Sequence, residues 1–249
     1  KNFDIPQTVY HNTNGDFTIN SVVLETSGEY VNTGLIFEHD QGENTNDTII
    51  PGWTFSRDGA SSYRNVWYIE HGMRPNIFQA AWYIETPTQK PSIALHGSTA
   101  AITMSDLVDG QSYLLEFYAA YSHHDPGNAG TGSGLIVKLK QTSLIPDVTY
   151  PDQILMDSNP TKITNSNDTS QFFLPKYSLP FTASGTGSPT TISFYYQHAG
   201  ASARMAFISD VQVTSQIQVQ QTDGQAIFDV TEGNKLNLMR IKGKDGLDI

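Results

Sequence analysis

Aromatic side chains and planar polar groups are concentrated between residues 61 and 83 of this sequence. Two of the three tryptophans lie there. A flat apolar ring beside a few polar anchors is the usual composition of a small-ligand site, and it suits a sugar, which has an apolar ring face and a rim of hydroxyls. The residues that we expect to contact a ligand here are Tyr63, Arg64, Trp67, Tyr68 and Trp82. Because neighbouring side chains of a strand point to opposite faces, we expect one of Trp67 and Tyr68 to face the core.

A second group of chemically capable side chains is Tyr121, Ser122, His123, His124 and Asp125, followed by a glycine-rich stretch. Two histidines beside an aspartate are typical of metal binding or acid–base chemistry. Adjacent side chains in an extended segment point apart, however, so one ion would not hold both histidines. We therefore predict that Tyr121 and His123 contact a ligand by hydrogen bonding from a loop, and metal binding there is the alternative.

Catalysis by carboxylates is the next chemistry to weigh, because the chain has 25 Asp and Glu. A glycosidase needs two carboxylates facing each other across a cleft. Glu70, Glu85 and Glu116 fall in strand-like segments, but the sequence cannot pair them. No nucleophile-elbow or zinc-protease motif is present. The interpretation is that the protein is not an enzyme.

Composition excludes several classes of function. Fourteen basic residues against 25 acidic residues give a net charge of −11, and this argues against nucleic acid as a partner. No apolar run approaches the ~20 residues that a membrane-spanning helix requires, so we expect no membrane insertion. The absence of cysteine removes disulfides, thiolate metal sites and cysteine nucleophiles.

The elements that must position these residues are strands. Apolar and polar residues alternate with period two in short runs bounded by turn residues, and this pattern is typical of β structure. The clearest strands are predicted at residues 112–120, 134–140, 190–197 and 205–214, with two more within 92–104 about His96-Gly97. The best candidate for a helical turn is 104–108. Asn14-Gly15, Asp109-Gly110 and Asp223-Gly224 are turn signals, and the last predicts a hairpin.

Charge divides the chain unevenly. Residues 1–234 hold 10 basic and 23 acidic groups, for a net charge of −13, whereas residues 235–249 hold 4 and 2, for a net charge of +2. We predict one domain over residues 1–215 and a hairpin or linker extension over residues 216–249 that leads to a further domain or stalk. The extension has few large apolar residues, so we expect either pairing with neighbouring copies, as in a homotrimer or larger assembly, or an unstructured linker.

Several short motifs resemble galactose-binding-like jelly-roll domains, above all the DUF642 and family 4-type carbohydrate-binding modules. The motifs are Asn14-Gly15-Asp16-Phe17, Ile50-Pro51-Gly52-Trp53, Val66-Trp67-Tyr68-Ile69, residues 92–97, residues 117–121 and residues 207–213. The resemblance implies an all-β jelly-roll sandwich. Independently of it, we expect Trp53, which follows Pro51-Gly52, in the core, because aromatic residues of all-β proteins are more often buried than ligand-facing. The resemblance also implies a structural Ca²⁺ at Asp210. The family's N-terminal acid is replaced by Thr18, which leaves Asp16 as the second candidate ligand and weakens the cation site.

The function that these observations favour is non-catalytic recognition of a glycan or polysaccharide by a surface adhesin or a virion tail or fibre protein, located outside the cell or on the virion surface. The first alternative is a purely structural virion or cell-surface domain that binds no ligand. The second is an accessory or catalytic domain of a glycoside hydrolase.

Overall fold

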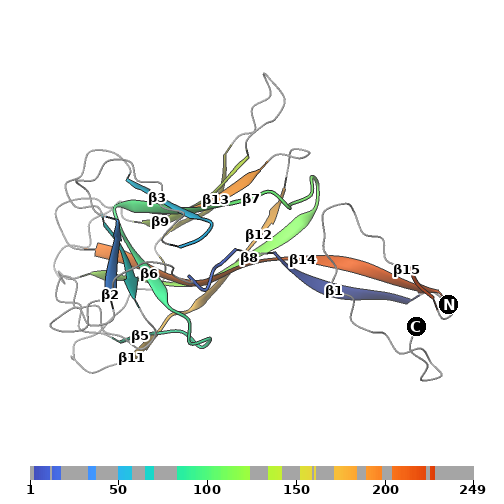
Figure 1. Cartoon of the computed structure of the whole chain (residues 1–249), viewed down its shortest axis with the longest axis horizontal. Coiled ribbons are helices and arrows are strands. Elements are labelled where there is room, and N and C mark those ends of the chain that lie inside the picture. The colour runs from blue at the N-terminus through green and yellow to red at the C-terminus, as the bar shows by residue number, and fades with distance from the viewer. Residues whose placement is uncertain are drawn as a thin grey trace, which may run out of the picture.

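Figure 1 shows the computed structural model of the chain. It describes residues 3–11, 13–17, 33–37, 50–57, 65–69, 83–123, 134–141, 152–158, 160, 171–183, 189–197, 204–222 and 225–227. All regular elements within these ranges are strands. The helical turn predicted at residues 104–108 is wrong, because a bend and irregular backbone connect two strands there. No helix in the described ranges is long and apolar enough to cross a membrane.

The strands form two antiparallel sheets that pack as a sandwich, which confirms the predicted fold class (Figure 1). The larger sheet has the order β12 (Lys176–Thr182), β8 (Ser112–His123), β14 (Arg204–Thr222), β6 (Ser92–His96), β4 (Asn65–Ile69) and β2 (Thr33–Phe37), with β1 (Phe3–His11) and β15 (Gln225–Ile227) both paired to β14. The five-stranded sheet has the order β10 (Gln153–Ser158), β9 (Gly134–Gln141), β13 (Thr190–Gln197), β7 (Ser98–Met104) and β3 (Trp53–Arg57). A short parallel pair joins β5 (Tyr83–Glu85) to β11 (Gln171–Phe173).

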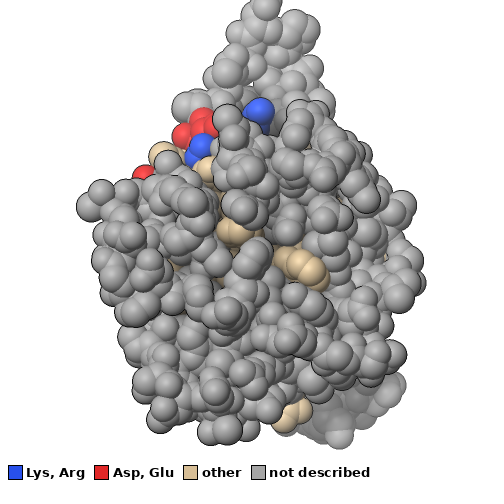
Figure 2. All heavy atoms as spheres, turned by 90° about the vertical axis from the view of Figure 1, so that its left-hand side faces the viewer, with Lys and Arg blue, Asp and Glu red and all other residues tan. Residues whose placement is uncertain are grey.

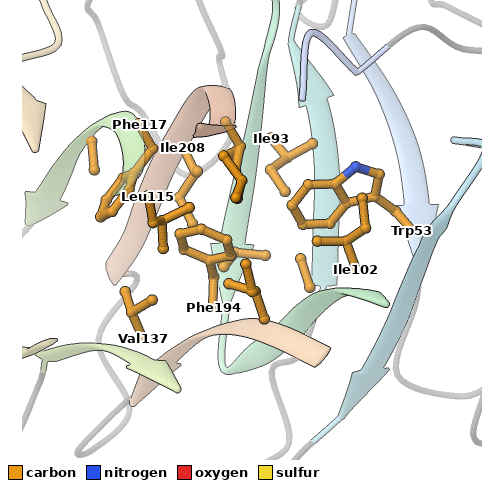
Figure 3. Close-up of a cluster of buried hydrophobic side chains, with 14 of the residues drawn as sticks. Trp53, Ile93, Ile102, Leu115, Phe117, Val137, Phe194 and Ile208 are labelled. Carbon is orange, nitrogen blue, oxygen red and sulfur yellow. The ribbon is translucent and has the colours of Figure 1, made fainter. Parts of the chain in front are cut away.

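The core lies between the two sheets and is built by alternate residues of each strand. In β9, Leu135, Val137 and Leu139 are buried, as their period-two spacing predicts. Figure 3 shows Phe194 among buried residues from both sheets, and its ring centroid lies 5.1 Å from that of Phe117 and 6.1 Å from that of Trp53. Trp53 is fully buried, which confirms its core position. Each such side chain contributes about 1.5–3 kcal/mol by leaving water.

A second apolar cluster lies on the outer face of the larger sheet. It consists of Ile69, Ala94, Ala120, Leu174, Met205 and Phe207, with Trp67 and Tyr118 packed against it. Strands β4, β6, β8 and β14 are therefore apolar on both faces where they pass this cluster. This explains why all five residues of β6 are buried and why its sequence does not alternate.

The turn at residues 13–17 is tied tightly to β14. The Val211 amide donates to the Gly15 carbonyl at 3.0 Å, and the Thr13 hydroxyl donates to the Val211 carbonyl. Trp53 Nε1 donates to the Thr13 carbonyl at 2.9 Å, which fixes the turn to the core. A Cβ atom on Gly15 would lie 1.6 Å from the Val211 oxygen, so only glycine permits this approach.

Strand β14 extends beyond the sandwich as part of an arm (Figure 1). Its pairing with β8 ends at Ser215 opposite Tyr113, whereas its pairing with β1 continues to Phe3 opposite Gln221. The antiparallel pairing of β14 with β15, from Gln220 opposite Ile227 to Thr222 opposite Gln225, confirms the hairpin that the sequence predicted here, although residues 223–224 themselves lie outside the described ranges. The last β8 partner coincides with the predicted boundary at residue 215. The division of the chain into a domain and an extension stays a prediction, because residues 228–249 lie outside the described ranges.

Candidate functional site

The outer face of the five-stranded sheet carries an unusual number of hydroxyl groups. Inward residues of β3, β7, β13 and β9 are large and apolar, so the outward residues are the alternate ones. We call this surface the hydroxyl face and define it by Thr54, Ser56, Thr99, Thr103, Lys138, Thr191, Ser193 and Tyr195.

The strand register fixes how these side chains are arranged. Tyr195 of β13 is opposite Thr99 of β7, and Thr99 is opposite Ser56 of β3. Ser193 is opposite Lys138 of β9. Lys140 is opposite Thr191, and the apolar residues Ala101 and Ile136 are opposite Ser193 and Tyr195. Directly opposed residues lie ~4.5–5.5 Å apart, so one aromatic ring, two ammonium groups and several hydroxyls lie close together on this face. The Thr103 and Thr191 hydroxyls are 2.9 Å apart, in hydrogen-bond contact.

This arrangement suits binding better than catalysis. Tyr195 lies between Thr99 and Ile136 of the neighbouring strands and is partly exposed, and the hydroxyl groups nearby both donate and accept hydrogen bonds. Among the described residues of this face and its β10 edge, Asp157 is the one carboxylate, whereas hydrolysis of a glycoside needs two. On the end of the molecule shown in Figure 2, acidic and basic groups of the described residues lie side by side rather than in a patch of one sign.

The structure separates the ligand-contacting residues that the sequence predicted around residues 63–83. Tyr63, Arg64 and Trp82 lie outside the described residues. Tyr68 is 6% exposed and packs in the core, so no ring of a ligand can stack on it, and the prediction for this residue is corrected. Trp67 is half-buried on the opposite side of the strand, against the second apolar cluster. The expected alternation of the pair is confirmed.

Tyr121 and His123 belong to β8 and not to a loop, which corrects the second predicted group. The strand continues past Ala120 because Tyr121 and His123 pair with Ala206 and Arg204 of β14. Tyr121 is half-buried against the core between the sheets, whereas Trp67 lies on the outer side of the same sheet. The two aromatic residues therefore cannot line a single site.

The two acids predicted to hold a cation lie on either side of the contact between Gly15 and Val211. Asp210 is 5% exposed, has a left-handed backbone (φ 47°), and its carboxylate accepts from Gln212 Nε2 at 2.9 Å. Asp16 is paired with Lys90, with 3.3 Å between its Oδ2 and the lysine Nζ. In the described part of the chain, no three His, Asp or Glu side chains are arranged so that they could hold one metal ion. These donors fall short of the six to eight oxygens that Ca²⁺ takes, so the cation stays a prediction.

A polar relay of two buried side chains and one exposed carboxylate, which the sequence did not predict, lies where the arm leaves the sandwich. His11 Nδ1 is 2.8 Å from Asp106 Oδ2, and its Nε2 is 3.1 Å from the Ser215 hydroxyl. The hydrogen bond with His11 lowers the pKa of the Asp106 carboxyl below its usual value of 3.8. Tyr113 packs edge-on to the His11 ring, and burial raises the pKa of this tyrosine above its usual value of 10.0.

The connectivity of this relay is that of a Ser-His-Asp triad, but its setting is structural. Ser215 is 2% exposed and lies in the middle of a paired strand, so its oxygen cannot reach a substrate carbonyl. His11 and Ser215 are 204 residues apart in the sequence, and no local pattern joins them to Asp106. The relay instead fastens β1, β14 and the β7–β8 connection to one another.

The chain matches no protein-family model and no curated protein sequence. Similar solved structures include the CBM22-1 and GH10 modules of a Clostridium thermocellum xylanase complexed with xylohexaose (12% identity, TM-score 0.41, 66% of this chain and 26% of that chain). Another is the CBM22-2 xylan-binding domain from Paenibacillus barcinonensis (11% identity, TM-score 0.41, 70% and 95%). A third is the enzymatically active domain of bacteriophage CBA120 tailspike protein 4 (15% identity, TM-score 0.36, 70% and 20%). The match thus spans about a quarter or less of the xylanase and tailspike chains, and these similarities are too low to show a shared family.

Proposed function

We propose that this chain is a non-catalytic carbohydrate-binding domain and that the hydroxyl face is its binding surface. The observation that carries the proposal is the partly exposed ring of Tyr195 among serine and threonine hydroxyls on its own and adjacent strands. A pyranose ring can stack on Tyr195 while its hydroxyls exchange hydrogen bonds with Thr99, Ser193 and Lys138. Because the side chains stand on paired strands, little ordering is needed when a sugar binds.

The expected affinity is modest. Stacking on one aromatic ring contributes about 0.5–1.5 kcal/mol beyond the buried area, and each net hydrogen bond contributes about 0.5–1.5 kcal/mol. A few such contacts give a binding free energy of about −4 kcal/mol, which corresponds to a Kd of about 1 mM. A surface of this strength becomes useful when several copies bind one polymer.

We also propose a setting in which several copies would act together. An adhesin or virion tail or fibre protein outside the cell would present such domains in multiple copies, and residues 216–249 would join neighbouring chains, as in a homotrimer. Support for this setting comes from the arm, which leads away from the sandwich. Sedimentation of the full chain would test it, and a monomer at all concentrations would contradict the assembly.

The experiment that tests the binding function is a titration of the full chain with neutral oligosaccharides and polysaccharides, preceded by a broad glycan array. Xylan belongs in the set because it is named as the ligand of a similar structure. Tyr195→Ala should weaken binding at least tenfold, and Phe173→Ala is the matched control because Phe173 is an exposed aromatic (56%) on a different sheet. A parent protein that binds no glycan would favour the purely structural alternative.

The site predicted from the sequence provides the competing result. If binding survives Tyr195→Ala but is lost in a Trp67→Ala, Trp82→Ala double variant that keeps its unfolding midpoint, the ligand binds near residues 63–83 and not on the hydroxyl face. Release of reducing sugar by the parent protein would contradict the non-catalytic assignment and favour the glycoside hydrolase alternative.

A further inference from the structure

We infer that a second carbohydrate contact surface lies on the opposite sheet, at the base of the arm. It is centred on Tyr10 of β1 and includes Thr8, Gln212 and Gln216, and we call it the Tyr10 surface. The inference rests on the proposed function for the class of its ligand. It adds a site that faces away from the hydroxyl face.

Tyr10 is 71% exposed although it lies within a paired strand. Its neighbour His11 points inward to Asp106 and Ser215, so alternation directs Tyr10 to the outer face. A single exposed aromatic residue on a protein surface needs no special explanation. The case for a site therefore depends on what surrounds the ring.

Two glutamine side chains flank the ring and are held in place. Tyr10 is opposite Thr214, so Gln212 and Gln216 of β14 lie two residues away on either side and on the same face. Gln216 Nε2 is bound to the Thr8 hydroxyl at 2.8 Å, and Gln212 Nε2 donates to the Asp210 carboxylate at 2.9 Å. An ionised carboxylate can only accept, so Gln212 must direct its NH₂ group to Asp210 and keep its carbonyl oxygen for another donor. Gln216 donates its NH₂ group to the Thr8 hydroxyl, so its carbonyl oxygen is a second acceptor, and a sugar hydroxyl is a suitable donor for both.

The spacing and charge of the surface select the type of ligand. Residues 212 and 216 are four positions apart on one strand, a span of roughly 13 Å, which suits an oligosaccharide better than a single sugar. The four side chains of the surface are uncharged. The Asp210 carboxylate that holds Gln212 is only 5% exposed, and Glu116, which is opposite Gln212 on β8, is paired with Lys176 at 2.7 Å. A neutral polyhydroxyl chain is therefore a better match than a nucleic acid or a strongly charged protein.

Two binding surfaces on opposite sheets would let one chain connect two polysaccharide strands or grip one strand at two points. Each surface is weak on its own, but linked contacts can raise the apparent affinity by about 10²–10⁴-fold when geometry permits. The inference thus predicts a stoichiometry of two short oligosaccharides for each chain. It also predicts that the parent protein binds polymers much more tightly than oligomers.

The main comparison is between four full-length proteins, which are the parent, Tyr195→Ala, Tyr10→Ala and the double variant, and three further variants follow below. Each is titrated with one neutral oligosaccharide by calorimetry and with the corresponding polysaccharide by affinity electrophoresis. Tyr10→Ala should reduce the stoichiometry from two to one and weaken polysaccharide binding about tenfold or more. Gln212→Ala should weaken binding in the same assay, whereas Tyr10→Phe should retain stacking and most of the affinity. Phe173→Ala is the control because Phe173 is an exposed aromatic residue (56%) on β11, outside both surfaces.

The outcomes distinguish this inference from the proposed function. If the parent binds one oligosaccharide and Tyr10→Ala binds like the parent, the second surface is refuted and the proposed function stands. If Tyr10→Ala abolishes binding and Tyr195→Ala does not, the Tyr10 surface stands and the hydroxyl face is refuted. If binding is unchanged but Tyr10→Ala alters the sedimentation of the chain, the surface is a contact between copies, and the inference is overturned.

Discussion

Replacing Gly15 by alanine tests the close contact between the N-terminal turn and β14. Gly15 has no left-handed backbone, so the substitution adds volume without conformational strain. The new Cβ would lie 1.6 Å from the Val211 oxygen, and the two backbones must move apart. We expect the free energy of unfolding to fall by about 3–6 kcal/mol, from overpacking (about 1–3) and from the loss of two buried hydrogen bonds at Val211.

Gly110→Ala is the matched control because Gly110 has the opposite properties. Its φ is +75°, and nothing lies within 4 Å of the position that a Cβ atom would take. Alanine there has to adopt a left-handed backbone, which costs about 1–2 kcal/mol, but it meets no neighbour. Comparing the two variants separates the cost of lost space from the cost of backbone strain.

Urea unfolding followed by tryptophan fluorescence measures both changes, with stability taken from midpoints at equal m-values. For a chain of this size, the loss expected for Gly15→Ala corresponds to a fall in Tm of about 6–20 °C. The reasoning is refuted if Gly15→Ala costs no more than Gly110→Ala. That result would mean that the turn and β14 are not in contact through their backbones.

Three further predictions concern the same part of the molecule. Asp106→Asn should lower the free energy of unfolding at neutral pH. The difference from the parent should vanish as the pH falls below 3.8, because a carboxyl whose pKa is lowered on folding stabilises the fold only while it is ionised. Urea midpoints between pH 2 and pH 7 measure this difference. Trp53→Phe should cost about 1–3 kcal/mol in urea unfolding, since it leaves the buried Thr13 carbonyl without its donor. If Asp210 holds a structural Ca²⁺, EDTA should lower the Tm and Ca²⁺ restore it, whereas Asp210→Asn should remove the response; an unchanged Tm in EDTA would contradict the cation.

The strands of the sandwich could be predicted because their signal is local. In β9 and β13 the alternation of apolar and polar residues marks both the element and its buried face. The hairpin at Asp223-Gly224 was predicted for the same reason, since two residues of the required type separate two strand-like runs. By contrast, β8 was predicted to end at Ala120 because nothing in its own sequence reports that β14 pairs with its last three residues.

The candidate sites depended on information that a local pattern does not contain. Thr191, Ser193 and Tyr195 form ordinary outward positions of one strand, and they become a polar surface only when β13 lies between β7 and β9. The sequence did contain one indication of this surface, because the outward positions of that strand hold two hydroxyl residues and a tyrosine. Tyr10 and Gln212 are still further apart, because β1 and β14 come from the two ends of the described chain.

The pairing of β1 with β14 also determines how the molecule would respond to mechanical tension. Phe3 and Gln221 are direct partners at the far end of the arm, and the register runs inward from there to His11 and Val213. Tension that separates residues 3 and 221 would therefore open the ladder one pair at a time, as a zipper, instead of shearing all of its hydrogen bonds together. Opening would continue until it reached the relay of His11, Asp106 and Ser215, where several interactions must break at once. The arm would yield at low force and separate Thr8 from Gln216 at the outer edge of the Tyr10 surface, while the sandwich and its hydroxyl face would remain folded.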